Sequence, residues 1–127
     1  MTRVLVCGGR DFTDREWLYR VLDNLNLEKT IEVIIHGGAQ GADTMAGRWA
    51  EILCIPTQVI RADWKRHGRA AGPIRNLEML DRGRPDLVVA FPGGRGTNHM
   101  IRSALKANVP CAALSSKERH IAFERGP

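Results

Sequence analysis

The stretch that decides the fold is a short apolar run followed by a glycine-rich turn, Asp86-Leu87-Val88-Val89-Ala90-Phe91-Pro92-Gly93-Gly94-Arg95-Gly96-Thr97. Residues 87–91 are all apolar, which is typical of a parallel strand covered on both faces. From Thr97 onward, apolar residues return at helical spacing. A strand, a glycine turn and a helix start together favour anion binding, because the first amides of a helix are unpaired and carry the positive end of its dipole.

The same succession of strand, turn and helix recurs along the chain. Apolar and β-branched runs predict further strands at residues 3–7, 31–35, 56–60 and 109–113. Amphipathic spacing predicts helices after a Thr13 cap and over residues 41–53, 73–81 and 97–107, with residues 61–72 irregular. The alternation predicts one α/β domain with a parallel sheet and right-handed crossovers. This domain spans residues 1–127, with its core at about 2–114 and a polar tail at 115–127.

The apolar residues of two of these helices predict which face is buried. In the helix after Gly41, the inward residues should include Ile52 and Leu53. In the helix that begins at Pro73, we expect Ile74, Leu77 and Leu80 to face inward.

Composition limits the classes of protein to which the chain can belong. With 127 residues, 43% of them hydrophobic and 26% charged, the chain can fold around a single core. Its three cysteines lie far apart without a CxxC pair, which argues against disulfides and structural zinc, so we expect no metal and a cytoplasmic location. No apolar stretch approaches the ~18 residues of a membrane helix, so we expect no membrane association. The net charge of +5 permits an anionic partner without naming one.

Three glycine turns are expected at one edge of the sheet, because the carboxyl ends of parallel strands meet there and ligands bind there. The first turn is Gly8, Gly9, Arg10 and Asp11; the second contains Gly37, Gly38, Ala39, Gln40, Gly41 and Asp43; the third is Pro92, Gly93, Gly94, Arg95, Gly96 and Thr97. Short connections often use glycine for its backbone freedom alone. Polar side chains accompany every turn here, and this favours a ligand cleft over plain connectors.

A basic segment leaves the same edge at residues 61–69. Its Lys65 could neutralise a phosphate and its Trp64 could stack on a base, or the segment could be an ordinary solvated loop. Arg75 and Asn76, near the start of the next helix, are further candidates. His36 ends a strand at this edge and is interpreted as a structural histidine, while an acid–base role stays open because an imidazole titrates near neutral pH. Neither GxGxxG nor GxxxxGK[ST] is complete, which disfavours a dinucleotide enzyme and a P-loop ATPase, and we expect no cofactor.

Five motifs in order resemble the SLOG superfamily, most closely its small YspA-related group of bacteria and phages. They extend over about residues 2–114 and comprise Gly8 to Asp11, His36 to Asp43, Ala62-Asp63-Trp64, Gly72 to Asn76 and Pro92 to Thr97. The resemblance implies a Rossmann-like three-layer α/β/α fold with a mainly parallel five-stranded sheet that binds nucleotides or related phosphorylated ligands. Dimers are common in the superfamily, so a homodimer stays open.

Two better-understood relatives differ in what they imply. The second turn is similar to a segment of DNA-processing protein A, which binds single-stranded DNA. The third is similar to the PGGxGTxxE motif of the cytokinin-activating phosphoribohydrolases, which cleave an N-glycosidic bond in nucleoside monophosphates. The glutamate of that motif is Met100 here, whereas cleavage of a glycosidic bond calls for a carboxylate beside the sugar. Asp11 and Asp43 are the candidate replacements.

Three functional hypotheses follow, in order of preference. The first is binding of a nucleotide or a nucleotide-derived phosphorylated ligand, as a sensor or carrier, with Arg10, Lys65 and Arg75 neutralising charge. The second is an enzyme that hydrolyses an N-glycosidic bond, with Asp11 or Asp43 as the catalytic carboxylate. The third is binding of single-stranded nucleic acid through residues 61–69.

Overall fold

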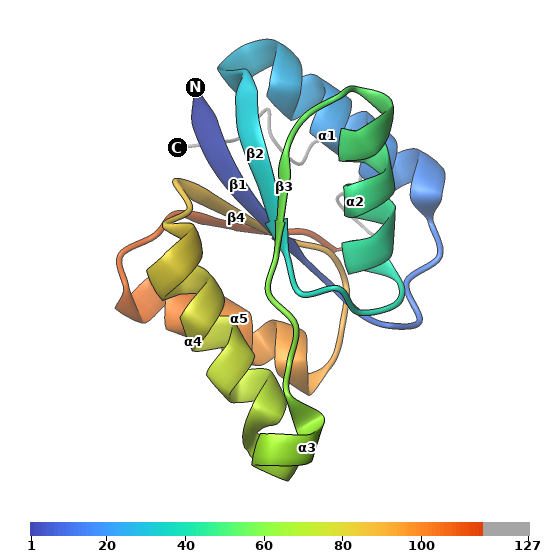
Figure 1. The fold of residues 1–127 in the computed structure, drawn as a ribbon. Helices are drawn as coiled ribbons and strands as arrows, with labels where there is room; N and C mark the ends of the chain where they lie inside the picture. Colours follow the sequence, from blue (N-terminus) through green and yellow to red (C-terminus); the bar gives the residue numbers. More distant parts are fainter. Residues whose placement is uncertain (116–127) are drawn as a thin grey trace.

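The computed structural model of the chain describes residues 1–115, so the predicted tail beyond Ser115 lies outside the described residues. Figure 1 shows the succession of elements, coloured along the chain. In chain order they are β1 (Thr2–Cys7), α1 (Arg15–Lys29), β2 (Ile31–His36), α2 (Ala42–Ile52), β3 (Thr57–Val59), α3 (Trp64–His67), the 3₁₀ turn η1 (Gly68–Ala70), α4 (Ala71–Gly83), β4 (Leu87–Ala90), α5 (Arg95–Lys106) and β5 (Cys111–Ala113).

The five strands form one sheet in the order β3-β2-β1-β4-β5, and every neighbouring pair is parallel. The chain therefore moves outward from β1 through β2 to β3, and then returns to build β4 and β5 on the other side of β1. In such a sheet the order of strands reverses between β1 and β4, which is where ligands bind in open α/β folds. The prediction of a mainly parallel, five-stranded α/β/α domain is confirmed.

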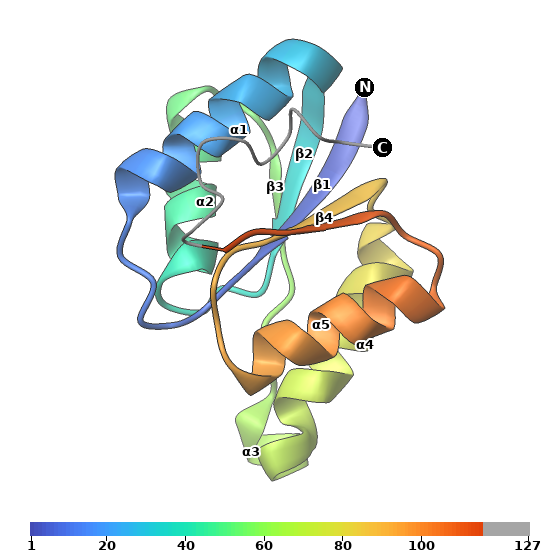
Figure 2. The ribbon, with the colours of Figure 1, turned by 180° about the vertical axis from the view of Figure 1, so that it is seen from behind.

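Helices cover both faces of the sheet, as Figures 1 and 2 show from opposite sides. Helices α1 and α2 pack on one face around buried Trp17, Leu22 and Trp49, together with Val4 and Val6 of β1. The other face is covered by α4 and α5, which bring Met79 and Met100 against Leu5 and Ile35. The central strands are thus buried on both faces, as their uninterrupted apolar runs require.

Several boundaries differ from those predicted. Helix α1 is capped by Asp14, not Thr13: the Asp14 carboxylate accepts the Trp17 N–H at 3.1 Å. An Asp at this position also places negative charge at the positive end of the helix dipole, which a Thr does not. Ile52, the last residue of α2, and Leu53, its C-cap, are exposed, because the helix ends there and the chain turns toward β3.

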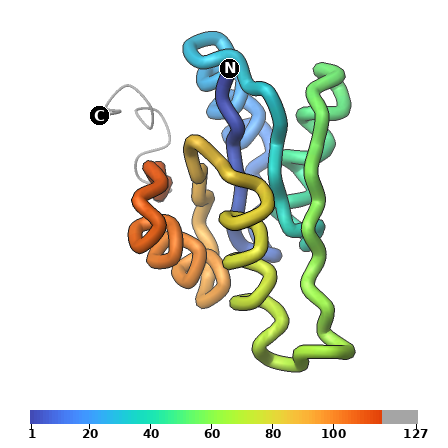
Figure 3. The backbone as a smooth tube through the Cα atoms, turned by 60° about the vertical axis from the view of Figure 1, so that its left-hand side comes forward, coloured from blue at the N-terminus to red at the C-terminus, as the bar shows by residue number. Residues whose placement is uncertain are grey.

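Residues 61–72 were expected to be irregular, but this prediction is wrong for most of the segment. Asp63 caps the short helix α3 through the Arg66 N–H, and η1 leads directly into α4 at Ala71, two residues before Pro73. Pro73 is tolerated there because first-turn amides need no helical acceptor. Figure 3 shows this segment reaching beyond the carboxyl edge of the sheet.

The predicted inward face of α4 is wrong for Ile74 and Leu77, whereas Leu80 packs against the core as predicted. Ile74 and Leu77 are 39% and 54% exposed, whereas Asn76 and Met79 are buried against the sheet and α5. The helix is rotated so that a polar side chain, Asn76, enters the core side, where its hydrogen-bonding groups find partners on α5 and on Arg75. A hydrophobic pattern cannot anticipate a buried amide that is satisfied by distant residues.

Candidate functional site

The three glycine turns meet at the carboxyl edge of the sheet. The Gly9 N–H donates to Pro92 O at 2.9 Å and joins the first turn to the third. Gly9 O accepts the Ala42 N–H at 3.4 Å and joins the first turn to the start of α2. Gly41, at φ +80°, has no room for a side chain, because a Cβ there would collide with Gly9 O. The close approach of three backbone segments therefore explains much of the glycine at this edge.

A central cleft of about 310 Å³ opens between these turns and α4. We define it by its lining residues: Cys7, Gly8, Gly9, Arg10, Ala39, Asp43, Arg75, Asn76, Met79, Gly94, Gly96 and Thr97. All three turns, and the predicted pair Arg75 and Asn76, contribute to it.

The second turn uses its polar groups internally. One carboxylate oxygen of Asp43 accepts the N–H groups of Gly37 at 3.0 Å and Ala39 at 3.2 Å, and Nδ1 of His36 accepts the Gly38 N–H at 3.0 Å. Its carbonyls are also engaged, since Arg75 donates to Gly37 O at 2.9 Å and Arg61 to Gly38 O at 3.1 Å. With these amides engaged, the turn serves as a rigid wall of the cleft and offers a phosphate no N–H of Gly37, Gly38 or Ala39.

The third turn is the opposite case. The backbone N–H groups of residues 93–97 have no hydrogen-bond acceptor among the described residues, and no side chain caps α5 at Gly94. These amides stand at the N-terminus of a helix of 12 residues, where the dipole favours negative charge. The third turn thus presents a continuous run of backbone donors without an acceptor among the described residues.

The glycines of the third turn fall into two kinds. A Cβ on Gly93 would lie 2.7 Å from the Gly9 nitrogen, so this position is glycine for reasons of packing. A Cβ on Gly94 or Gly96 would meet no atom within 4 Å apart from the adjoining backbone, and neither residue has a positive φ. Packing does not demand glycine at these two positions, whereas close approach of a ligand to the backbone would.

Arg75 and Asn76 support the third turn from α4. Asn76 is buried, and its amide nitrogen donates to Gly96 O at 3.1 Å and lies 3.1 Å from Nδ1 of His99. Its amide oxygen accepts Nε of Arg75 at 3.2 Å, so one side chain fixes both the first turn of α5 and a cationic group of the cleft. Burial lowers the pKa of Arg75, and the nearby Asp43 opposes that shift, so the guanidinium keeps its charge inside the cleft.

The two candidate carboxylates are placed very differently. Asp43 is buried in the cleft wall, and burial raises its pKa while the Ala39 and Gly37 amides and Arg75 act in the opposite direction. Its engagement with the second turn gives it a structural task. Asp11 is exposed and does not line the central cleft. Met100 is fully buried in the apolar layer between α5 and the sheet, so that position supplies packing and no carboxylate.

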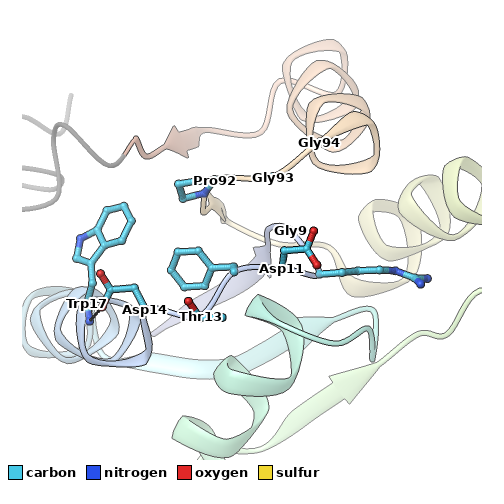
Figure 4. A pocket seen from close by; sticks show the side chains of 10 residues that line it. Gly9, Asp11, Thr13, Asp14, Trp17, Pro92, Gly93 and Gly94 are labelled. Atoms are coloured by element: carbon cyan, nitrogen blue, oxygen red, sulfur yellow. Dashed lines mark hydrogen bonds between the residues drawn. The ribbon is translucent and has the colours of Figure 1, made fainter.

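Asp11 lines an outer pocket of about 600 Å³ beside the central cleft, shown in Figure 4. Gly9 and Asp11 lie on one side of this outer pocket, and Pro92, Gly93 and Gly94 lie on the other. Its remaining lining residues are Arg10, Phe12, Thr13, Asp14 and Trp17. The two cavities share Gly9, Arg10 and Gly94, so they are neighbouring compartments of one edge.

Other predicted residues lie outside both cavities. Lys65 on α3, Gln40 of the second turn and Arg95 at the start of α5 are exposed and line neither cavity. Gly37, Gly38 and Gly41 of the second turn line neither cavity either. Arg10 connects the projecting segment to the cleft, since its guanidinium lies 5.9 Å from the ring centroid of Trp64. Sequence reasoning did not name Met79, which lines the central cleft from α4, or His99 of α5, which lies beside Asn76, as site residues. No signal short of the tertiary packing identifies them.

Comparison with known proteins agrees with this architecture. The model of the YspA, cpYpsA-related SLOG family matches residues 2–67. The chain is also 42% identical over 125 residues to the Gene 61 protein of Mycobacterium phage D29. The alignment covers 92% of this chain and 99% of that protein. The chain belongs to the SLOG family.

The SLOG match contains the first two glycine turns and ends at the last residue of α3. Membership in this family suggests a nucleotide-related ligand. No helix within the described residues is long and apolar enough to cross a membrane, and no group of metal-binding side chains occurs among them.

Proposed function

We propose that this SLOG protein binds a nucleotide or a nucleotide-derived phosphorylated ligand at the carboxyl edge of its sheet, as a sensor or carrier domain. The observation that carries the proposal is the row of unpaired amides at residues 93–97, on a helix N-terminus whose Gly94 and Gly96 are open to the cleft. A phosphate held there accepts several backbone hydrogen bonds at once and requires no side chain to move.

Cationic side chains support the same placement. Arg10 lines both cavities and Arg75 lines the central cleft, so a phosphate on the third turn has two guanidinium groups near it. The outer pocket offers Asp11 and the aromatic Phe12 beside this point. A carboxylate that accepts ribose or base N–H and O–H groups, and an apolar ring that packs on a base, are what a nucleoside needs next to its phosphate.

Glycosidic hydrolysis is the second candidate, and the geometry gives it less support. It would require a carboxylate facing the sugar. Asp43 already accepts two amides, and Asp11 reaches only the outer pocket. If hydrolysis occurs, Asp11 is the residue that we expect to act, because its carboxylate has no assigned structural task in the described residues.

Thermal unfolding in the presence of a nucleotide panel, with mass spectrometry of each mixture, tests the proposal. A bound ligand at 100 times its Kd should stabilise the fold by about 2.7 kcal/mol. Gly94→Asp, which places a carboxylate on the open amides, should abolish the shift. Asn24→Asp adds the same charge at an exposed position of α1 and should leave the shift intact.

The outcomes separate the candidates. Intact nucleotides with a melting shift agree with binding alone. Free base or ribose phosphate that disappears in Asp11→Asn establishes hydrolysis instead. The absence of a shift with every nucleotide, or an equal shift in Gly94→Asp, contradicts the proposal.

A further inference from the structure

A third cavity, of about 670 Å³, lies on the far side of the second glycine turn from the central cleft. We call it the edge groove and define it by His36 of β2, Thr44, Gly47, Arg48 and Glu51 of α2, and Arg61 after β3. It shares no lining residue with the central cleft or the outer pocket, so the proposed nucleotide site does not account for it.

His36 is the unusual residue of this groove. The residue is only 7% exposed, and its Nδ1 accepts the Gly38 N–H at 3.0 Å. In the neutral ring the proton must then sit on Nε2. Burial and the neighbouring Arg61 lower the pKa of His36 to about 4, so the ring is neutral near pH 7 and presents Nε2–H as a donor.

No acceptor for Nε2 is present among the described residues. The atom lies beneath Gly47, where a Cβ would stand 2.8 Å from it, so a glycine at this point of α2 leaves room for the ring beside the groove. Every buried side-chain nitrogen and oxygen atom of the described residues has a partner, so the unpartnered Nε2 is open to the groove and available as a donor to a ligand there.

Two guanidinium groups accompany this donor. Arg61 uses one nitrogen to donate to Gly38 O, which fixes the side chain and leaves its other donors available. Arg48 forms no ion pair within 4.0 Å in the described part of the chain, although Glu51 lines the same groove. Donors thus approach from three elements: the end of β2, the middle of α2 and the connection after β3.

We propose that the edge groove is a second anion site, which binds the phosphate group of a small molecule through Arg48, Arg61 and Nε2–H of His36. A tetrahedral phosphate presents oxygens in several directions and can meet donors from three elements, whereas a planar carboxylate meets a single fork best. The proposal does not depend on nucleotide binding in the central cleft.

Inorganic phosphate, titrated at constant ionic strength, is the probe. The readout is ¹H–¹⁵N NMR of the His36 imidazole and the Arg48 side chain, recorded in the Gly94→Asp variant so that the third turn does not compete. We expect these signals to move with saturation, and Arg48→Gln to weaken the apparent affinity about tenfold through the loss of a charge-assisted contact. Arg20→Gln, an exposed arginine of α1, is the matched control and should change nothing.

Acetate forms the second arm and should bind more weakly than phosphate. The proposal is overturned if the His36 and Arg48 signals stay fixed while phosphate is added, if Arg48→Gln binds as tightly as its parent, or if acetate binds equally well. Because Arg48 is exposed and makes no ion pair in the described structure, loss of folding is not expected to obscure the comparison.

Discussion

Replacing Gly96 by alanine should make the fold more stable and ligand binding weaker. Gly96 is the second residue of α5 and has no positive φ, and a Cβ added there would meet no atom within 4 Å apart from the adjoining helix backbone. Alanine in a helix is favoured over glycine by about 0.5–1 kcal/mol. For a domain of this size that corresponds to a rise in Tm of roughly 2–5 °C.

The same methyl should obstruct the anion. Helical Cβ atoms tilt toward the N-terminus, so the methyl of Gly96→Ala points toward the unpaired amides that precede it. Losing one or two charge-assisted hydrogen bonds at about 1.5–3 kcal/mol each weakens binding by roughly tenfold to more than a hundredfold. The variant should therefore melt at a higher temperature alone but gain little from nucleotide.

Differential scanning calorimetry with and without nucleotide measures both effects on one sample. Gly93→Ala is the control, since its Cβ would lie 2.7 Å from the Gly9 nitrogen and should lower Tm before any ligand is added. A Gly96→Ala protein that keeps the full ligand-induced shift would refute the assignment of these amides to ligand binding. A lower Tm in the absence of ligand would refute the claim that packing does not require glycine there.

Three further variants test the roles of His36, Asn76 and Met100. The pKa of His36 is lowered from 6.5 to about 4, so the unfolded state binds more protons between these values and stability should fall as the pH drops through that window, by up to about 3 kcal/mol. His36→Asn keeps an acceptor for the Gly38 N–H and should flatten this slope in urea denaturation at several pH values; an unchanged slope would exclude His36 as its source. Asn76→Leu removes the donor to Gly96 O and should cost about 1–3 kcal/mol in stability together with nucleotide affinity, whereas unaltered binding in titration calorimetry would show that α5 needs no such support. Met100→Glu places a charge in the apolar layer and should destabilise the fold by several kcal/mol without creating hydrolase activity; a folded variant that releases free base by mass spectrometry would contradict this.

The fold and the general position of the site could be predicted because their signals are local. Uninterrupted apolar runs such as residues 87–91 identify strands buried on both faces, and parallel strands bring their carboxyl ends to one edge. The convergence of the three glycine turns could be predicted from that geometry, and the structure brings all three together at the cleft.

What could not be predicted depends on contacts between distant residues. The second and third turns are both rich in glycine and look similar in the sequence. In the structure, Asp43 and His36 accept the amides of the second turn, whereas the amides of the third turn stay open. In the same way, Asn76 is buried because Gly96 O and Arg75 satisfy it, whereas Ile74 and Leu77, which hydrophobicity alone places inward, are exposed. Hydrogen-bond partners of this kind become apparent only when the whole chain is folded.

The third turn follows β4, the strand that pairs with β1 at the junction between the two halves of the sheet. β1 pairs with β4 over four residues, from Val4 and Leu87 to Cys7 and Ala90, and this ladder connects the three-strand half of the sheet to the two-strand half. A ligand that contacts Arg10 on one half and the amides of residues 93–97 on the other would act as a removable cross-link across this seam. Amide hydrogens of β4 would then exchange more slowly with solvent when ligand is bound, even though the ligand touches none of them.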